Sequence, residues 1–152
     1  MVTHKRSRAS TRALVKKAEE FHGHLGPFLA IGIRIGQIGL RKLDLIEHAN
    51  SLRILLRVLP KVPYSCVIDG IQISTGCTLG NQRLCVENAG RIEAKFKDLD
   101  TDKNVTVSPQ PAVFAMLKEQ IIGGNLPEKK LRQMAWTIAS MSEEDLCNVE
   151  NG

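Results

Sequence analysis

Two histidines separated by a single residue are the side chains of this protein most suited to chemistry. His22 and His24 are separated by Gly23, and Pro27 follows three residues later, in a chain with only four histidines. In an extended segment, residues i and i+2 point to the same side, so both imidazoles can approach one ion. Zinc takes about four ligands from Cys, His and carboxylate side chains, so the other ligands must come from elsewhere in the chain. The alternative is an ordinary turn at the end of a helix, in which both imidazoles are hydrogen-bonded.

A second segment, residues 66–81, gathers thiols, a carboxylate, an amide and hydroxyls among glycines. Gly76 and Gly80 flank Cys77 and leave the backbone free to bend, so that a thiol there can present a thiolate to a metal or a substrate. If this segment meets the histidine pair, His22, His24 and Cys77 supply three metal ligands. One coordination position then stays open, as a catalytic or substrate-binding metal requires.

The polar residues around these candidates each allow more than one interpretation. Asp69 is either a general acid or base, or a partner that fixes a histidine tautomer, or else an ordinary carboxylate on a helix surface. Cys66 is either part of the pocket or a small buried hydrophobe. Gln72 and Thr75 either orient a ligand or cap the end of a helix. Arg34, on an otherwise apolar helix, pairs either with Asp69 or with an anion.

The elements that must position these residues follow from apolar spacing and capping residues. Helices are expected over residues 10–21, 27–43, 112–122 and 127–141, the third ended by Gly123 and Gly124. Strands are expected over residues 52–59, 83–86, 92–96 and 105–107, the last three as an antiparallel meander. Residues 66–75 fit either a strand or a helix, and a short helix that begins after Ser65 and ends at Gly76 is preferred. The acidic segment beyond Ser142 is expected to fray.

Three glycines form a stripe along the second expected helix. That helix is apolar nearly all round, which predicts a central, buried position. Gly32, Gly36 and Gly39 each cost about 1 kcal/mol in helix propensity relative to alanine, so the stripe indicates close approach of another backbone. A second copy of the chain is one candidate for this neighbour.

Composition indicates one α+β domain that extends over residues 10–141, with a flexible basic tail at 1–9 and an acidic tail at 142–152. The net charge of +5 is concentrated in Lys5, Arg6, Arg8, Arg12, Lys16 and Lys17. Aromatic residues make up only 4%, so nucleic-acid binding through this basic segment is the weakest of the function classes considered. Neither a secretory signal nor a membrane span is apparent, which favours a cytoplasmic protein with four reduced cysteines.

Two motifs of this chain resemble those of the formylmethanofuran dehydrogenase E-subunit family. They occur in the family's order, and the resemblance covers about residues 10 to 120. The residues that carry it are Phe21-His22-Gly23-His24-Leu25-Gly26-Pro27, then Gly32, Arg34 and Gly36, then Cys66-Val67-Ile68-Asp69-Gly70-Ile71-Gln72, then Thr75-Gly76-Cys77-Thr78-Leu79-Gly80.

The resemblance implies an α+β domain with a mixed or antiparallel sheet flanked by helices, similar to the catalytic domain of glyceraldehyde phosphate dehydrogenases. It also implies a homodimer and a divalent metal, most often zinc. The implied site residues are the metal ligands His22, His24 and Cys77, the catalytic candidates Asp69 and Cys77, and the ligand-contacting residues Cys66, Gln72 and Thr75. The family name links the protein to formylmethanofuran, one-carbon metabolism and methanogenesis. Two kinds of function fit the resemblance: an enzyme, or a non-catalytic dimeric scaffold whose metal is structural or absent.

The chain also departs from the family pattern. Gly26 stands where many relatives have a cysteine, and Gly80-Asn81-Gln82 stands where many have Gly-Lys-Gly-Asn. Long members end in a cysteine-rich zinc module, whereas Cys147 is the single cysteine in the last stretch here. The resemblance is therefore to the short form of the family.

Overall fold

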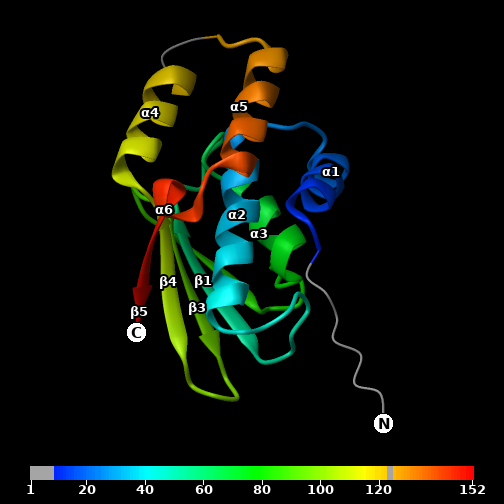
Figure 1. The fold of residues 1–152 in the computed structure, drawn as a ribbon, viewed down its shortest axis with the longest axis vertical. Helices are drawn as coiled ribbons and strands as arrows, with labels where there is room; N and C mark the ends of the chain where they lie inside the picture. The colour runs from blue at the N-terminus through cyan, green and yellow to red at the C-terminus, as the bar shows by residue number, and fades with distance from the viewer. Residues whose placement is uncertain (1–8, 123–124) are drawn as a thin grey trace.

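The computed structural model describes residues 9–122 and 125–152 and shows a mixed sheet flanked by helices (Figure 1). The helices are α1 (Thr11–His22), α2 (Pro27–Lys42), α3 (Cys66–Thr75), α4 (Pro111–Ile122), α5 (Glu128–Ser140) and α6 (Glu143–Leu146). The strands are β1 (Leu52–Val58), β2 (Leu84–Asn88), β3 (Glu93–Asp98), β4 (Asn104–Pro109) and β5 (Cys147–Asn151). The expected α+β class is confirmed, and so is the choice of a helix for residues 66–75.

The five strands lie in the order β2-β1-β3-β4-β5. β1 and β2 are parallel, and every other neighbouring pair is antiparallel. A parallel pair needs a long crossover, which α3 supplies between β1 and β2. The expected meander is therefore correct for β3 and β4 but wrong for β2, which pairs with the other edge of β1.

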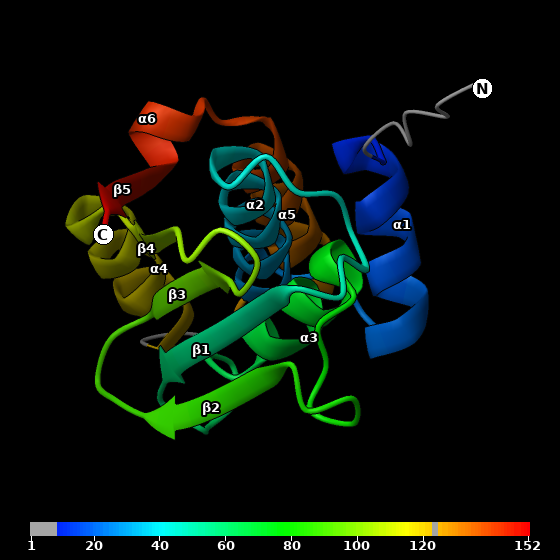
Figure 2. The ribbon, with the colours of Figure 1, turned by 90° about the horizontal axis from the view of Figure 1, so that it is seen from below.

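The helical layer buries one face of this sheet. Along β1, Leu52, Ile54, Leu56 and Val58 are buried, and the residues between them are partly exposed. Figure 2 shows α2 and α3 lying together on one side of the strands. All residues of α2 from Pro27 to Ile33 are buried, so the predicted central helix is confirmed.

The glycine stripe of α2 packs inside the chain. A Cβ built on Gly32 would collide with the carbonyl oxygen of Val67, and one built on Gly36 would collide with a side chain of α3. Gly39 faces the ring of Phe96 in β3 in the same way. The interpretation of this stripe as a contact with a second copy of the chain is therefore wrong, because α3 and β3 of the same chain already occupy it.

The segment after Ser142 is ordered. The Ser142 hydroxyl accepts a hydrogen bond from the backbone N–H of Asp145 at 3.3 Å and so caps α6. β5 then pairs antiparallel with β4, with Val149 opposite Val107. The expectation of a fraying acidic tail is wrong, because these residues complete the sheet and cover an edge of β4.

Some expectations concern residues outside the described ranges. They include the basic residues Lys5, Arg6 and Arg8 and the helix-ending Gly123 and Gly124. Within the described ranges, no helix combines the length and the apolar character needed to cross a membrane.

Candidate metal centre

The histidine pair lies where α1 turns toward α2. His22 is the last residue of α1, and Gly23 ends the helix with a φ of +96°, while its N–H donates to the carbonyl of Glu19 at 2.8 Å. Glycine adopts this left-handed conformation at low cost. The pair therefore sits in a tight turn rather than in the expected extended segment. The turn still brings the rings of His22 and His24 together, with centroids 4.4 Å apart.

Cys66, the first residue of α3, completes a group of three potential ligands. One ligand atom from each of His22, His24 and Cys66 lies within 4.8 Å of the other two. Burial raises the pKa of the Cys66 thiol, and the negative charge of Asp69 raises this pKa further. Two imidazole nitrogens and one thiolate are a ligand set that zinc accepts, with one position left for a further ligand.

A chain of hydrogen bonds fixes the His22 ring. Its Nδ1 lies 2.5 Å from Oδ2 of Asp69, so the proton of the neutral imidazole is assigned to Nδ1. Nε2 of Gln72 donates to Oδ1 of Asp69 at 3.1 Å, and Oε1 of Gln72 accepts from the N–H of Leu79 at 3.0 Å. A carboxylate behind a histidine is the usual arrangement that orients a metal ligand.

The other nitrogen of this ring has no partner. Nε2 of His22 is buried and is, among the described residues, the single buried side-chain nitrogen or oxygen without a hydrogen bond. Leaving such an atom unsatisfied costs about 1–3 kcal/mol. Because Nδ1 carries the proton toward Asp69, Nε2 presents a lone pair, and a bound cation would satisfy it. The residues present therefore fit a metal.

A small apolar cavity of about 60 Å³ adjoins the group. His24 and Cys66 border it together with the residues Gly26, Pro27, Phe28, Leu29, Pro63, Ile121 and Leu131. A Cβ at Gly26 would meet no atom within 4 Å, so a larger side chain would find open space at this position. The cavity places an apolar surface beside Cys66 and His24, while the His24 side chain itself is exposed.

The structure places Cys77 away from the histidines. Cys66 and Cys77 flank opposite ends of α3, and ten helical residues span roughly 15 Å. Gly76 ends α3 with a φ of +77° and turns Cys77 inward, where its buried Sγ lies 3.7 Å from the carbonyl oxygen of Leu52. Burial raises the pKa of the Cys77 thiol, which disfavours the nucleophilic thiolate. The expected combination of Cys77 with the histidines is thus corrected in favour of Cys66.

Two further candidates have local roles. The Thr75 hydroxyl donates to the carbonyl of Ile71 at 2.6 Å and accepts from the N–H of Cys77 at 3.0 Å, which matches the helix-capping alternative. Arg34 does not pair with Asp69, because Asp69 contacts His22 and the Arg34 guanidinium donates to the end of α5. Thr75 and Arg34 therefore lie outside the three-residue group.

The sequence pattern predicts Cys66 as a neighbour of the site, not as a metal ligand. A signal for its role is present in the helix period, because Cys66 and Asp69 are three residues apart and share one face of α3. Once Asp69 is paired with a histidine, Cys66 must lie beside that histidine.

Comparisons with known proteins agree with this architecture. A solved structure of a tungsten formylmethanofuran dehydrogenase E-subunit (FmdE)-like protein from Syntrophus aciditrophicus superposes with a TM-score of 0.68 at 18% identity, over 100% of this chain and 77% of that one. That likeness shows a shared fold.

A probable S-adenosyl-L-methionine-binding protein of Archaeoglobus fulgidus is 40% identical over 79 residues, which is 51% of this chain. The aligned part is 21% of that protein's length. The family model described as FmdE, molybdenum formylmethanofuran dehydrogenase operon, matches residues 21–148. Because this match includes both motifs and most of the chain, the protein belongs to the FmdE family.

Proposed function

We propose that this protein binds a divalent cation, zinc by preference, through His22, His24 and Cys66. The observation that carries the proposal is the buried Nε2 of His22, which has no partner while Asp69 holds Nδ1 of the same ring. An N,N,S ligand set suits zinc better than magnesium or calcium, which prefer oxygen ligands.

The chain's own residues would prepare this site for a ligand. Bound zinc with an open position supplies a Lewis acid. Asp69 and Gln72 keep the His22 ring oriented, and an apolar cavity borders His24 and Cys66. The FmdE name associates the family with formylmethanofuran dehydrogenase operons, so we assign the site to one-carbon metabolism.

Metal analysis of protein purified without an affinity tag tests the site. We expect an equimolar amount of zinc in the unaltered chain and its loss in a His22→Ala, Cys66→Ser double variant. Cys85→Ser and His48→Gln are matched controls, because they remove an exposed cysteine and a histidine outside the group. Metal content unchanged in the double variant would overturn the proposal.

Cobalt substitution identifies the sulfur ligand separately. We expect a thiolate-to-cobalt charge-transfer band that disappears in Cys66→Ser and persists in Cys85→Ser. A band that persists in Cys66→Ser would assign the thiolate to another cysteine. Asp69→Asn keeps all three ligands, yet we expect it to weaken metal binding by about 10–100-fold, because it loses the carboxylate that orients His22.

We propose in addition that the face around the metal centre binds a second copy of the chain. Three large apolar side chains close in sequence to the site residues are exposed: Phe21 at 60%, Val62 at 72% and Leu79 at 52%. Phe21 precedes His22, and the N–H of Leu79 bonds to Gln72. Large apolar side chains that are exposed together are typical of a surface that a partner covers, which is the arrangement this proposal assumes.

Light scattering after size-exclusion chromatography tests this second role. A dimer is expected for the unaltered chain and a monomer for Phe21→Ser, Val62→Ser. Leu99→Ser removes a comparably exposed side chain, at 51%, from the turn between β3 and β4 and should leave the dimer intact. A monomeric unaltered chain would contradict the proposal and favour a partner of another kind.

A further inference from the structure

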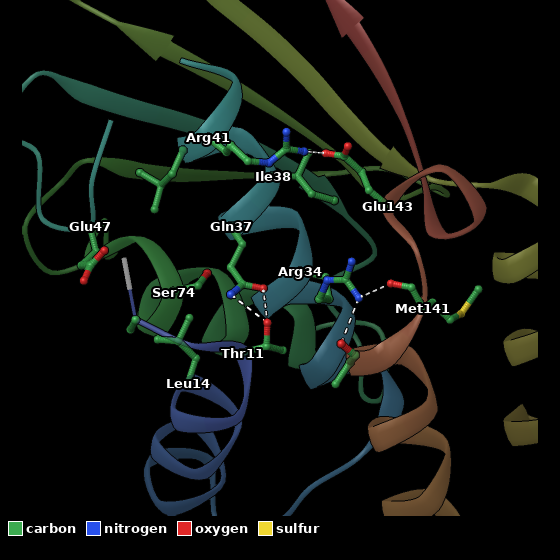
Figure 3. A pocket seen from close by; sticks show the side chains of 13 residues that line it. Thr11, Leu14, Arg34, Gln37, Ile38, Arg41, Glu47, Ser74, Met141 and Glu143 are labelled. Atoms are coloured by element: carbon green, nitrogen blue, oxygen red, sulfur yellow. Dashed lines mark hydrogen bonds and ion pairs between the residues drawn. The ribbon is translucent and has the colours of Figure 1, made fainter. Parts of the chain in front are cut away.

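A second cavity, of about 340 Å³, lies between α1, α2 and the segment that follows α5 (Figure 3). Its polar wall includes Thr11 of α1, Arg34 and Gln37 of α2, and Glu143 of α6. None of its lining residues belongs to the metal centre. The volume is in the range of pockets that hold small organic molecules.

Arg34 uses only one of its nitrogens to hold the protein together. Nη1 donates to three backbone carbonyls at the end of α5, those of Ile138 at 3.0 Å, Ala139 at 3.0 Å and Met141 at 2.7 Å. A guanidinium carries five N–H donors in one plane. Among the described residues, no group accepts a hydrogen bond from Nε or Nη2 of Arg34.

Within the described part of the chain, Arg34 is a cation of this cavity that has no ion pair. Arg41 also lines the cavity, but its guanidinium is paired with the carboxylate of Glu143 (Figure 3). Arg34 forms no ion pair with any described carboxylate. Burial lowers the pKa of Arg34, which reflects the cost of removing its charge from water, and the nearby negative charge of Glu143 offsets this effect only in part. A ligand anion that reached this guanidinium would offset that cost.

Other residues of the cavity wall determine which chemical groups the ligand can carry besides its anionic group. Thr11 and Gln37 hydrogen-bond to each other, with Nε2 of Gln37 3.1 Å from Oγ1 of Thr11, and they offer polar groups close to Arg34 (Figure 3). Leu14 and Ile38 supply an apolar surface. Glu47 lies on the wall as well, and its carboxylate has no cationic partner among the described residues.

We propose that this cavity binds a small organic monocarboxylate, whose carboxylate pairs with the free edge of the Arg34 guanidinium. The planar fork of arginine matches a carboxylate in two parallel hydrogen bonds. Among the described residues that line the cavity, Arg34 is the cation without an ion pair, and Glu47 is a carboxylate without one. A ligand carboxylate can pair with Arg34, whereas a phosphate ester carries about −1.5 to −2 charges at neutral pH and would bring its excess charge into a cavity that already holds the Glu47 carboxylate. A second carboxylate on the ligand is disfavoured for the same reason.

Calorimetric titration with probes that share the same carbon skeleton tests the ligand class. The probes are butanoate, 4-aminobutanoate and butanedioate, with inorganic phosphate as a further anion. We expect saturable binding of butanoate and 4-aminobutanoate, and binding of butanedioate and phosphate weaker by about tenfold or more, which corresponds to 1.4 kcal/mol. The absence of saturable binding by both monocarboxylates, or equal affinity for butanedioate, would overturn the proposal.

Variants assign the binding to this cavity. Arg34→Lys keeps the charge but loses the fork, and a loss of about tenfold in butanoate affinity is expected. Because Arg34 also holds the end of α5, a second variant leaves it untouched: Glu47→Gln should bring the ratio of butanedioate affinity to butanoate affinity closer to one. An unchanged ratio in Glu47→Gln, or full butanoate affinity in a folded Arg34→Lys, would contradict the assignment. His22→Ala, Cys66→Ser should bind butanoate normally, because the two sites share no residue.

Discussion

Gly32 of α2 and Gly70 of α3 face each other with no room for a methyl group on either. A Cβ on Gly70 would lie 2.8 Å from the Cα of Gly32 and 2.7 Å from the backbone nitrogen of Ile33. The two helices therefore touch through their backbones. This contact sets the separation of the two elements that carry the metal centre, because His24 lies just before α2 and Cys66 begins α3.

Gly70→Ala is expected to destabilise the protein by about 1–3 kcal/mol, because the added carbon must push the helices apart. Gly90→Ala is the control, since a Cβ there would meet no atom within 4 Å. Urea denaturation measures both variants, and the control should stay within about 0.5 kcal/mol of the unaltered chain. Equal midpoints for the two variants would show that the α2–α3 contact tolerates a methyl group.

Gly26→Cys is expected to tighten metal binding. Gly26 borders the same cavity as His24 and Cys66, a Cβ there has free space, and its φ of −141° suits any residue. A thiolate from this position would add a ligand at the open side of the group. Competition with a chelator measures the gain, and Gly26→Ser is the control that fills the same space without a thiol. Identical chelator resistance in the two variants would show that position 26 does not reach the ion.

The helices and most strands were predictable from the sequence because their signals are local. The apolar run of α2, Ser10 before α1 and Gly76 after α3 each act within a few residues. β5 was missed because a short edge strand, with Cys147 buried, Val149 partly buried and its other residues exposed, depends on its partner β4 for its structure. The position of β2 depends on a crossover connection, which strand patterns do not encode.

Only part of the metal centre could be predicted from the sequence, because the rest depends on contacts between distant segments. The histidine pair and Asp69 follow from residue type and spacing, whereas the choice between Cys66 and Cys77 depends on which end of α3 meets α1. The contact between α2 and α3 at Gly32 and Gly70 makes that choice, and it is a packing interaction between segments far apart in sequence.

The three cysteines outside the metal centre are expected to differ sharply in alkylation. Cys85 is exposed, whereas Cys77 and Cys147 are buried. Burial raises the pKa of Cys147 to about 12 and raises that of Cys77 as well, so both stay as unreactive thiols. Iodoacetamide at pH ~8 should modify Cys85 in the native protein and the two buried residues only in urea, as peptide mass spectrometry would record. Native labelling of Cys77 at the rate of Cys85 would contradict the inward turn at Gly76.

Asp98 is expected to make stability depend on pH in the acid range. Its carboxylate accepts hydrogen bonds from the Ser51 hydroxyl, from the N–H of Asp100 at 3.0 Å and from the Thr101 hydroxyl at 3.0 Å. These bonds, that of Ser51 first, lower the pKa of Asp98. A carboxyl with a lowered pKa in the folded state stabilises the fold above the unfolded pKa of about 3.9, and this stabilisation is lost as the pH falls through the folded value.

Asp98→Asn should therefore be less stable than the unaltered chain at neutral pH, and this difference should shrink as the pH falls below about 4. Urea denaturation across the pH series measures it. Asp100→Asn removes an exposed carboxylate from the same turn and should show a smaller and flatter difference. If Asp98→Asn lost as much stability at acid as at neutral pH, the ionised carboxylate would not be the group that the turn stabilises. The three donors around Asp98 would then act through packing of the turn between β3 and β4, because only an interaction with the charged form disappears on protonation.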